Sequence, residues 1–191
     1  MIGRLILRGG LIAGSLALIL YGLYDANRRR KRPKSDDAGV ALAFELVEGV
    51  SLEEALSRGP LGTDQARRML GDVCQALAAA HARRQAHGDL RPASVRWGPD
   101  GTAKVAPSPQ AGPDATPAAD LEALAVLAYE MLTARKPDSD DEDEAFVPVT
   151  RLRPELPAAL NDFFAAALSD DAAKRPTDAA AFRAAFEECW S

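Results

Sequence analysis

Side chains that could carry chemistry are concentrated in one short stretch of the chain, residues 87–94. Its polar groups are an imidazole, a carboxylate, a guanidinium and a hydroxyl, which belong to His87, Asp89, Arg91 and Ser94. Groups of these types can move protons and bind anions when the fold brings them together. The stretch is therefore the candidate site, and its neighbours in the sequence must provide the elements that position it.

The rest of the chain offers few metal or redox ligands. Cys74 and Cys189 lie far apart and lack a metal-type spacing, which excludes a disulfide framework. His81 and His87 are the two histidines, too few for a histidine-cluster metal site. Cys74 and His81 fall on a predicted helix, where we expect them to fill core or surface positions.

Helices and one hairpin are predicted around the candidate site. A helix capped by Thr63 precedes it, with an apolar stripe at a spacing of 3.6 residues: Ala66, Met69, Leu70, Val73, Leu77 and Ala80. A hairpin over 95–105 follows, with its turn at 98–101. A buried helix over 120–132, a helix ending near 168 and a last helix capped by Thr177 complete the chain. Shorter elements are a strand over 40–47 and a helix capped by Ser51. The predicted fold is mainly α, with about six helices and one small β-hairpin.

The N-terminal segment is predicted to be a single transmembrane helix. Residues 9–24 carry no charge, and the apolar character extends back to Leu5 if Arg8 reaches the interface. The basic residues at 28–34 place the C-terminal domain in the cytoplasm by the positive-inside rule. A cleaved signal peptide is the alternative, which this basic run disfavours. The predicted organisation is an anchor over 1–34, a linker over 35–39 and a domain over 40–191.

Charge and small residues indicate the partners of the chain. Residues 1–34 hold eight basic and one acidic residue, whereas residues 35–191 hold 15 basic and 27 acidic residues. A domain this acidic disfavours nucleic-acid binding, because phosphate contact needs a basic face. Gly10 and Gly14 have the spacing that lets two membrane helices approach closely, which allows a weak homodimer. The acidic run 138–144 is expected to be solvated, with docking of a basic partner as the alternative.

Four segments together resemble the large lobe of eukaryotic-type Ser/Thr protein kinases. Residues 87–95, HGDLRPASV, are similar to the catalytic loop of that family, and residues 44–52, FELVEGVSL, to its interlobe hinge. Residues 120–133, DLEALAVLAYEMLT, resemble its central helix, and residues 171–177, DAAKRPT, its late Arg-Pro segment. The resemblance implies a kinase-like large lobe over about four-fifths of the chain.

Departures from the family pattern fall on the residues that bind ATP and metal. Only a short linker separates the anchor from the hinge, so we expect the small lobe to be absent, with its Gly-rich loop, Lys and Glu. Ser94 replaces the family's Mg²⁺-binding Asn, and Pro107-Ser108-Pro109 replaces Asp-Phe-Gly. We therefore expect neither ATP nor Mg²⁺ to be a cofactor and no metal site to exist. A weak nucleotide remnant along Glu45, Leu46 and Val47 is the alternative.

The resemblance also assigns roles to the residues that remain. Asp89 occupies the catalytic-base position, and holding the loop through backbone hydrogen bonds is its structural alternative. His87 and Asp120 are expected to tie the loop to the central helix. Arg91 stands at the family's Lys position, and Arg175 is expected to lack the Glu that pairs with it in the family.

The function predicted from these features is that of a membrane-anchored, catalytically inactive pseudokinase acting as an interaction or scaffold module in signalling. Two alternatives stay open: a Ser/Thr kinase in which a partner chain supplies the small lobe and Mg²⁺ ligands and Asp89 is the base, and a decayed remnant without activity. A free-standing large lobe would expose its former lobe interface. We therefore expect the face near Phe44, Leu46 and Val105 to be covered by a protein partner, the linker or the membrane.

Overall fold

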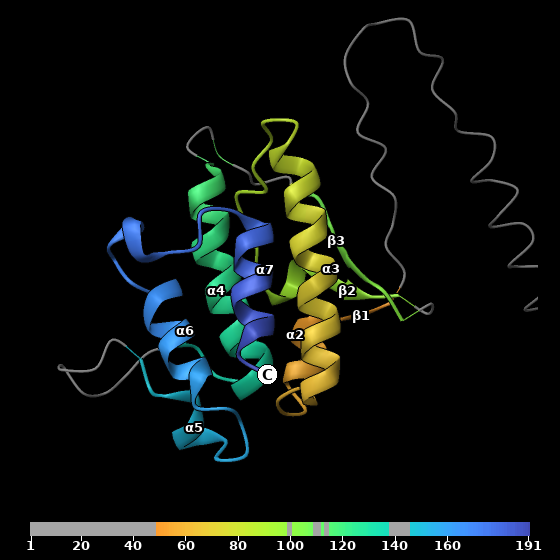
Figure 1. Cartoon of the computed structure of the whole chain (residues 1–191). Coiled ribbons are helices and arrows are strands. Elements are labelled where there is room, and N and C mark those ends of the chain that lie inside the picture. Colours follow the sequence, from red (N-terminus) through yellow and green to blue (C-terminus); the bar gives the residue numbers. More distant parts are fainter. Residues whose placement is uncertain (1–48, 99–100, 109–111, 113–114, 138–145) are drawn as a thin grey trace, which may run out of the picture. The chain divides into compact units, whose positions relative to one another are not determined.

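The computed structural model describes residues 49–98, 101–108, 112, 115–137 and 146–191 (Figure 1). They belong to the compact unit Phe44–Ser191. The helices in chain order are α2 Leu52–Leu56, α3 Thr63–His81, α4 Pro117–Thr133, α5 Val149–Leu152, α6 Ala159–Ala167 and α7 Ala179–Glu188. Two 3₁₀ turns are η1 Pro92–Ser94 and η2 Ala172–Lys174, and the strands are β1 Val50–Ser51, β2 Val95–Trp97 and β3 Ala103–Val105. The described part of the chain is mainly helical, as the sequence predicts.

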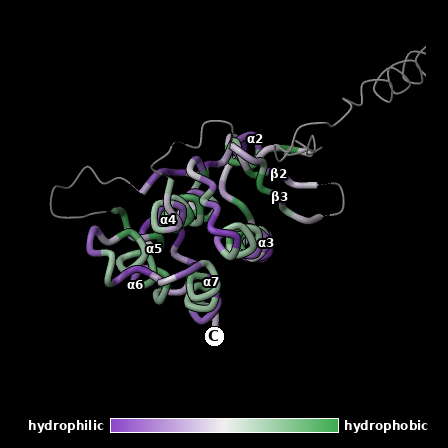
Figure 2. Tube along the Cα trace, turned by 90° about the horizontal axis from the view of Figure 1, so that it is seen from above, coloured by the Kyte–Doolittle hydropathy of each residue, from purple (hydrophilic) through white to green (hydrophobic). Residues whose placement is uncertain are grey.

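Helix α3 lies between α7 on one side and the small sheet on the other (Figure 2). Its buried residues include the predicted stripe from Ala66 to Leu77. Helix α4 packs beside α3 and is buried over most of its length, with Leu124, Ala125 and Tyr129 inaccessible to solvent. This confirms the prediction of a buried rather than amphipathic helix, because the run 123–129 is apolar nearly all round.

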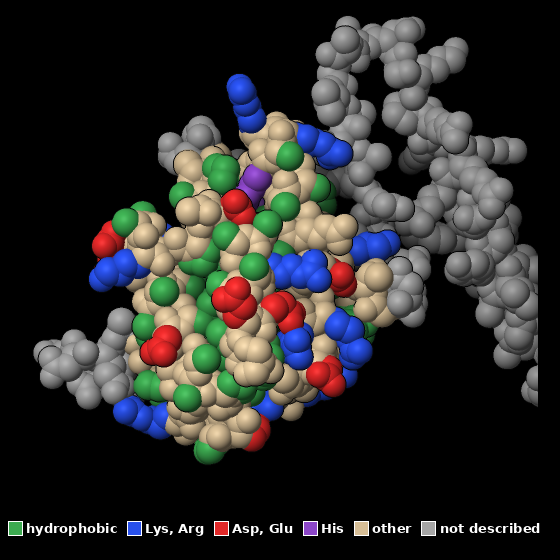
Figure 3. Space-filling view, viewed as in Figure 1, with side chains coloured by type: hydrophobic (Ala, Val, Ile, Leu, Met, Phe, Trp, Pro, Cys, Tyr) green, Lys and Arg blue, Asp and Glu red, His purple; other side chains and the backbone are tan. Residues whose placement is uncertain are grey.

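Aromatic rings join the C-terminal helices to α4. Phe163 on α6 meets Phe182 and Phe186 of α7 edge-on, at centroid distances of 5.1 and 5.5 Å. Tyr129 of α4 meets Phe164 in the same geometry at 5.4 Å. Such edge-to-face pairs add to the stabilisation from burial alone. Charged side chains of both signs lie among apolar ones on this face of the molecule (Figure 3). Between α3 and α7, Arg67 donates from Nε to Glu187 at 3.1 Å.

The sheet has three antiparallel strands in the order β1–β2–β3. The predicted hairpin is confirmed as β2 and β3, and β1 adds a third strand that was not predicted from the sequence, with Ser51 opposite Arg96. Gly49 makes this pairing possible: its φ is +140°, and a Cβ there would lie 1.9 Å from the carbonyl oxygen of Trp97. The predicted strand over 40–47 lies outside the described residues.

Helix ends differ from the sequence prediction in three places. Gly62, not Thr63, is the N-cap of α3. Helix α4 begins three residues before position 120, because Thr116 accepts a hydrogen bond from the Ala119 amide. Asp178 rather than Thr177 caps α7, since its carboxylate accepts from two free backbone amides of the first turn. The predicted cap of α2 at Ser51 is confirmed.

Within the described residues, no helix has the length and apolar character needed to cross a membrane. The predicted anchor over 1–34, with Gly10 and Gly14, and the linker over 35–39 lie outside those residues. The acidic run 138–144 also lies outside them.

Candidate functional site

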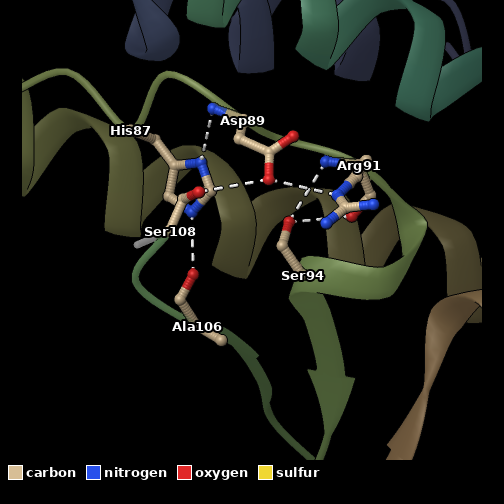
Figure 4. Close-up of polar contacts among 6 residues, drawn as sticks. All are labelled: His87, Asp89, Arg91, Ser94, Ala106 and Ser108. Carbon is tan, nitrogen blue, oxygen red and sulfur yellow. Dashed lines mark hydrogen bonds and ion pairs between the residues drawn. The ribbon is translucent and has the colours of Figure 1, made fainter. Parts of the chain in front are cut away.

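The candidate stretch leaves the C-terminal end of α3 and leads through η1 into β2 (Figure 4). Gly88 has a φ of +73°, a left-handed conformation that glycine adopts without a steric penalty. This turn directs the side chains of His87 and Asp89 toward the segment that follows β3, which contains Ala106 and Ser108. The stretch is therefore positioned by α3, β2 and β3 together.

Asp120 of α4 holds the start of this stretch. Its carboxylate, only 1% exposed, accepts from the backbone amides of His87 at 2.7 Å and Gly88 at 2.8 Å. The same carboxylate lies 2.8 Å from Nε2 of His81, at the end of α3. A buried carboxylate with three donors is a rigid attachment point. It joins the stretch, α3 and α4 at one place.

His81 is the member of this group that sequence reasoning missed. We expected it to fill a position on α3, because a single histidine in the last turn of a helix has no pattern that indicates a partner. Its contact with Asp120 is made across 39 positions of the sequence. Only the packing of α3 against α4 reveals the pair.

His87 braces the stretch through its ring. Nε2 lies 2.8 Å from the carbonyl oxygen of Ala106, and Nδ1 lies 3.3 Å from the amide nitrogen of Asp89. A carbonyl oxygen can only accept and an amide can only donate, so this geometry fits a neutral imidazole protonated on Nε2. The ring thus links the stretch to the segment that follows β3.

Asp89 is occupied by two donors of the same chain. Its Oδ2 accepts from Nε of Arg91 at 3.1 Å and from the hydroxyl of Ser108 at 3.1 Å. The Asp89 side chain is 28% exposed and that of Arg91 is 55% exposed, so the ion pair is partly solvated. These contacts are made by side chains, whereas the structural alternative for Asp89 anticipated backbone hydrogen bonds.

The Ser94 hydroxyl makes its hydrogen bonds within the stretch itself. The hydroxyl accepts from the amide of Arg91 at 3.1 Å and donates to the carbonyl oxygen of Arg91 at 2.8 Å. These two bonds close the turn around η1 and leave Ser94 acting as a local backbone brace (Figure 4).

Curated proteins similar to this chain bear the names of bacterial kinases. The serine/threonine-protein kinase pkn3 of Myxococcus xanthus is 29% identical over 198 aligned positions, which cover 79% of this chain and 36% of the relative. Pkn1 of the same organism is 30% identical over 187 positions, covering 76% of this chain and 27% of the relative. PknL of Mycobacterium tuberculosis is 27% identical over 206 positions, covering 88% and 50%.

The chain is a relative of the bacterial serine/threonine protein kinases. It spans half or less of the length of each of these curated relatives. No protein-family model matches it.

The loop of this kinase relative does not have the donors of a magnesium site. Mg²⁺ takes oxygen ligands, usually carboxylates, in octahedral geometry. At the positions where the family places its ligands, Ser94 is engaged with backbone groups of Arg91 and Pro107 has no side-chain oxygen. The carboxylate of Asp89 is bound by Arg91 and Ser108. Among the described residues, no three His, Cys, Asp or Glu side chains are grouped to hold a metal. No magnesium-dependent step can therefore be assigned to these residues.

Arg175 has an acidic partner, Glu122, and the prediction that it lacks the Glu of the family pattern stays a prediction. Its Nη1 donates to Glu122 of α4 at 2.8 Å, and its Nε donates to the carbonyl oxygen of Ser169 at 2.6 Å. The Arg175 side chain is 17% exposed. Glu122 lies on α4, 53 positions before Arg175 in the sequence, and no local spacing indicates the pair.

A cavity of about 860 Å³ opens beside the loop, between α2 and α4. Leu56, Leu90 and Val126 give it apolar walls, and Glu130 of α4 lies at its edge with 8% of its surface exposed. Burial raises the pKa of the Glu130 carboxyl, and the positive charge of Lys136 partly offsets this. The hinge-like residues Glu45, Leu46 and Val47 lie outside the described residues.

Proposed function

We propose that this kinase relative is a catalytically inactive, membrane-anchored module that acts in signalling by binding other proteins. It uses neither ATP nor Mg²⁺. Its kinase-like fold serves as a scaffold, and the candidate site is a structural remnant of the catalytic loop rather than a reaction centre.

The observation that carries this proposal is that Ser94 and Pro107 stand at the two positions where the family places its metal ligands. A general base must bring one carboxylate oxygen within hydrogen-bond distance of the substrate hydroxyl, and hydrogen bonds to its other oxygen do not by themselves prevent this. In this chain Oδ2 of Asp89 already accepts from Arg91 and from Ser108. Phosphoryl transfer depends mainly on positioned positive charge and metal ions. The donor set around Ser94 and Pro107 supplies neither of the metal ligands, which supports the inactive function.

Membrane attachment is the second part of the proposal. The uncharged run 9–24 and the basic flank 28–34 support an anchor with the kinase-like domain on the cytoplasmic side. If this holds, the full chain will stay with membranes during alkaline carbonate extraction, and deletion of residues 5–24 will release it. Release of the intact chain would refute the anchor.

The names of the relatives favour one alternative function, a Ser/Thr kinase completed by a partner chain. In that case the partner supplies a Gly-rich loop, a strand Lys and the Mg²⁺ ligands, and Asp89 accepts the proton of the substrate hydroxyl. A separate polypeptide with those features would then co-purify with this chain. Its presence together with activity that depends on Asp89 would favour this alternative.

The test is phosphoryl transfer from radiolabelled ATP by the full chain in detergent micelles, with Mg²⁺ or Mn²⁺ and a generic protein substrate. We expect the intact chain, Asp89→Asn and the matched surface control Asp162→Asn to give the same background. Transfer by the intact chain and Asp162→Asn, but not by Asp89→Asn, would refute the inactive function.

A further inference from the structure

The two faces of the three-stranded sheet differ in chemistry. Residues directly opposite each other in an antiparallel pair project to the same face, and neighbours along a strand project to opposite faces. Val95 and Ala103 are buried against the helices, and Val105, opposite Val95, packs against the same core. Val105 is thus part of the face that packs on the core, and the predicted covering of the region near Val105 by a partner, the linker or the membrane stays a prediction. Phe44 and Leu46 lie outside the described residues.

The outward face of the sheet is basic. It carries Ser51, Arg96 and Lys104, because Arg96 is opposite both of the others in the register. Arg96 donates from Nη1 to the carbonyl oxygen of Gly49 at 3.1 Å, and Lys104 is exposed. Neither side chain forms an ion pair with a carboxylate among the described residues. Two like charges placed directly opposite each other repel, so this arrangement is stabilised when an anion lies over it.

The sheet is also the described element that lies nearest in sequence to the predicted anchor. Fourteen residues separate Lys34 from Gly49, a length that reaches at most about 50 Å when extended. A domain tethered this closely to a bilayer meets it at a high effective concentration. The cytoplasmic leaflet is negatively charged and attracts lysine and arginine.

The net charge of the domain determines which of its faces an anionic surface attracts. Residues 35–191 carry 27 acidic and 15 basic residues, so an anionic surface repels most of the domain. A locally basic face is the part that such a surface attracts. The outward face of the sheet meets this condition beside the point where the chain arrives from the anchor.

We propose that the outward face of the sheet, formed by Arg96 and Lys104, docks on an anionic lipid surface. This inference rests on the membrane anchoring proposed above. The docked sheet fixes how the module is presented to its protein partners, with the α4 to α7 helices directed away from the bilayer.

Lysine reactivity measures this contact directly. The full chain is placed in phosphatidylcholine nanodiscs with or without phosphatidylserine and treated with an amine-reactive ester, and each lysine is followed by mass spectrometry. We expect Lys104 to react about fivefold more slowly in the anionic discs. High salt should restore its rate, because salt screens exposed charges. Lys174, exposed on η2, serves as the internal control and should react equally in both discs.

A matched pair of charge reversals tests the role of Arg96. Arg96→Glu should abolish most of the protection of Lys104 in anionic discs. Arg135→Glu, an exposed arginine after α4, should leave that protection unchanged. Equal effects of the two variants would show that net charge rather than this face governs the contact, and would overturn the proposal.

The outcomes separate this inference from the anchor on which it rests. If the chain resists carbonate extraction but Lys104 reacts equally in neutral and anionic discs, the docking proposal is wrong and the anchor stands. If carbonate releases the chain, the anchor and the docking proposal both fail. Protection of Lys104 in native membranes but not in purified anionic discs would assign the face to an acidic protein instead.

Discussion

Asp120 is predicted to be the residue of the candidate site whose polar contacts matter most for stability. Asp120→Asn keeps the side-chain shape but replaces one acceptor oxygen with an amide nitrogen. In the structure Oδ2 accepts from the His87 amide and faces Nε2 of His81, while Oδ1 accepts from the Gly88 amide. The imidazole of His81 can present an acceptor nitrogen to the new amide, but the backbone N–H of His87 or Gly88 cannot.

The expected loss of stability follows from that unpaired backbone N–H. At 1% exposure of Asp120, little water can replace the lost acceptor. An unsatisfied buried donor costs about 1–3 kcal/mol, and the lost charge on the remaining bond adds about 1 kcal/mol. We expect the free energy of unfolding to fall by about 3 kcal/mol. For a domain of this size, the corresponding drop in melting temperature is about 6–12 °C.

Thermal unfolding of the full chain, followed by far-UV circular dichroism, measures this change. Asp162→Asn on α6 is the matched control, since Asp162 is exposed, and it should melt within about 1 °C of the unmodified chain. If Asp120→Asn also melts within about 1 °C of the unmodified chain, Asp120 does not hold the loop as described.

Three further predictions concern buried groups. Glu130→Gln should raise the melting temperature at about pH 7, because burial raises the Glu130 pKa and makes its charged form costly. The increase should be smaller near pH 4, where the carboxyl is protonated. Melting curves of both proteins at the two pH values measure this difference. Burial raises the pKa of the Cys74 thiol to about 12, so iodoacetamide at mildly alkaline pH should modify Cys74 only after unfolding, as peptide mass spectrometry would show. Arg175→Gln should lower the free energy of unfolding by about 1–2 kcal/mol, mainly through loss of the bond to the Ser169 carbonyl, and a denaturant titration would detect it. The Glu130 prediction is contradicted if the increase in melting temperature is the same at both pH values, and the Cys74 prediction if the folded chain is alkylated rapidly. The Arg175 prediction is contradicted if the denaturant midpoint of Arg175→Gln equals that of the unmodified chain.

Much of the helical framework could be predicted from periodicity. The stripe on α3 and the apolar run 123–129 of α4 specify their buried surfaces, because only a helix places those residues against a core. Strand β1 could not be predicted, because a two-residue strand has no alternation to detect. Its pairing depends on the conformation of Gly49, which a sequence does not display.

The candidate site was predicted as a set of residues but not as a set of contacts. The resemblances carried by residues 87–95 and 120–133 placed His87, Asp89 and Asp120 in one region. The partners His81, Ser108 and Glu122 could not be foreseen, because each reaches its target across a long stretch of sequence. Such pairs arise from the packing of helices and strands, and no local spacing encodes them.

The most direct test of the central claim is the thermal stability of the full chain with and without millimolar ATP and Mg²⁺. A ligand that binds only the folded state raises its stability by mass action, whatever its later chemistry. The inactive, nucleotide-free function predicts the same melting temperature in both conditions. A rise that disappears in Asp89→Asn but persists in Asp162→Asn would contradict that function and indicate a working nucleotide site.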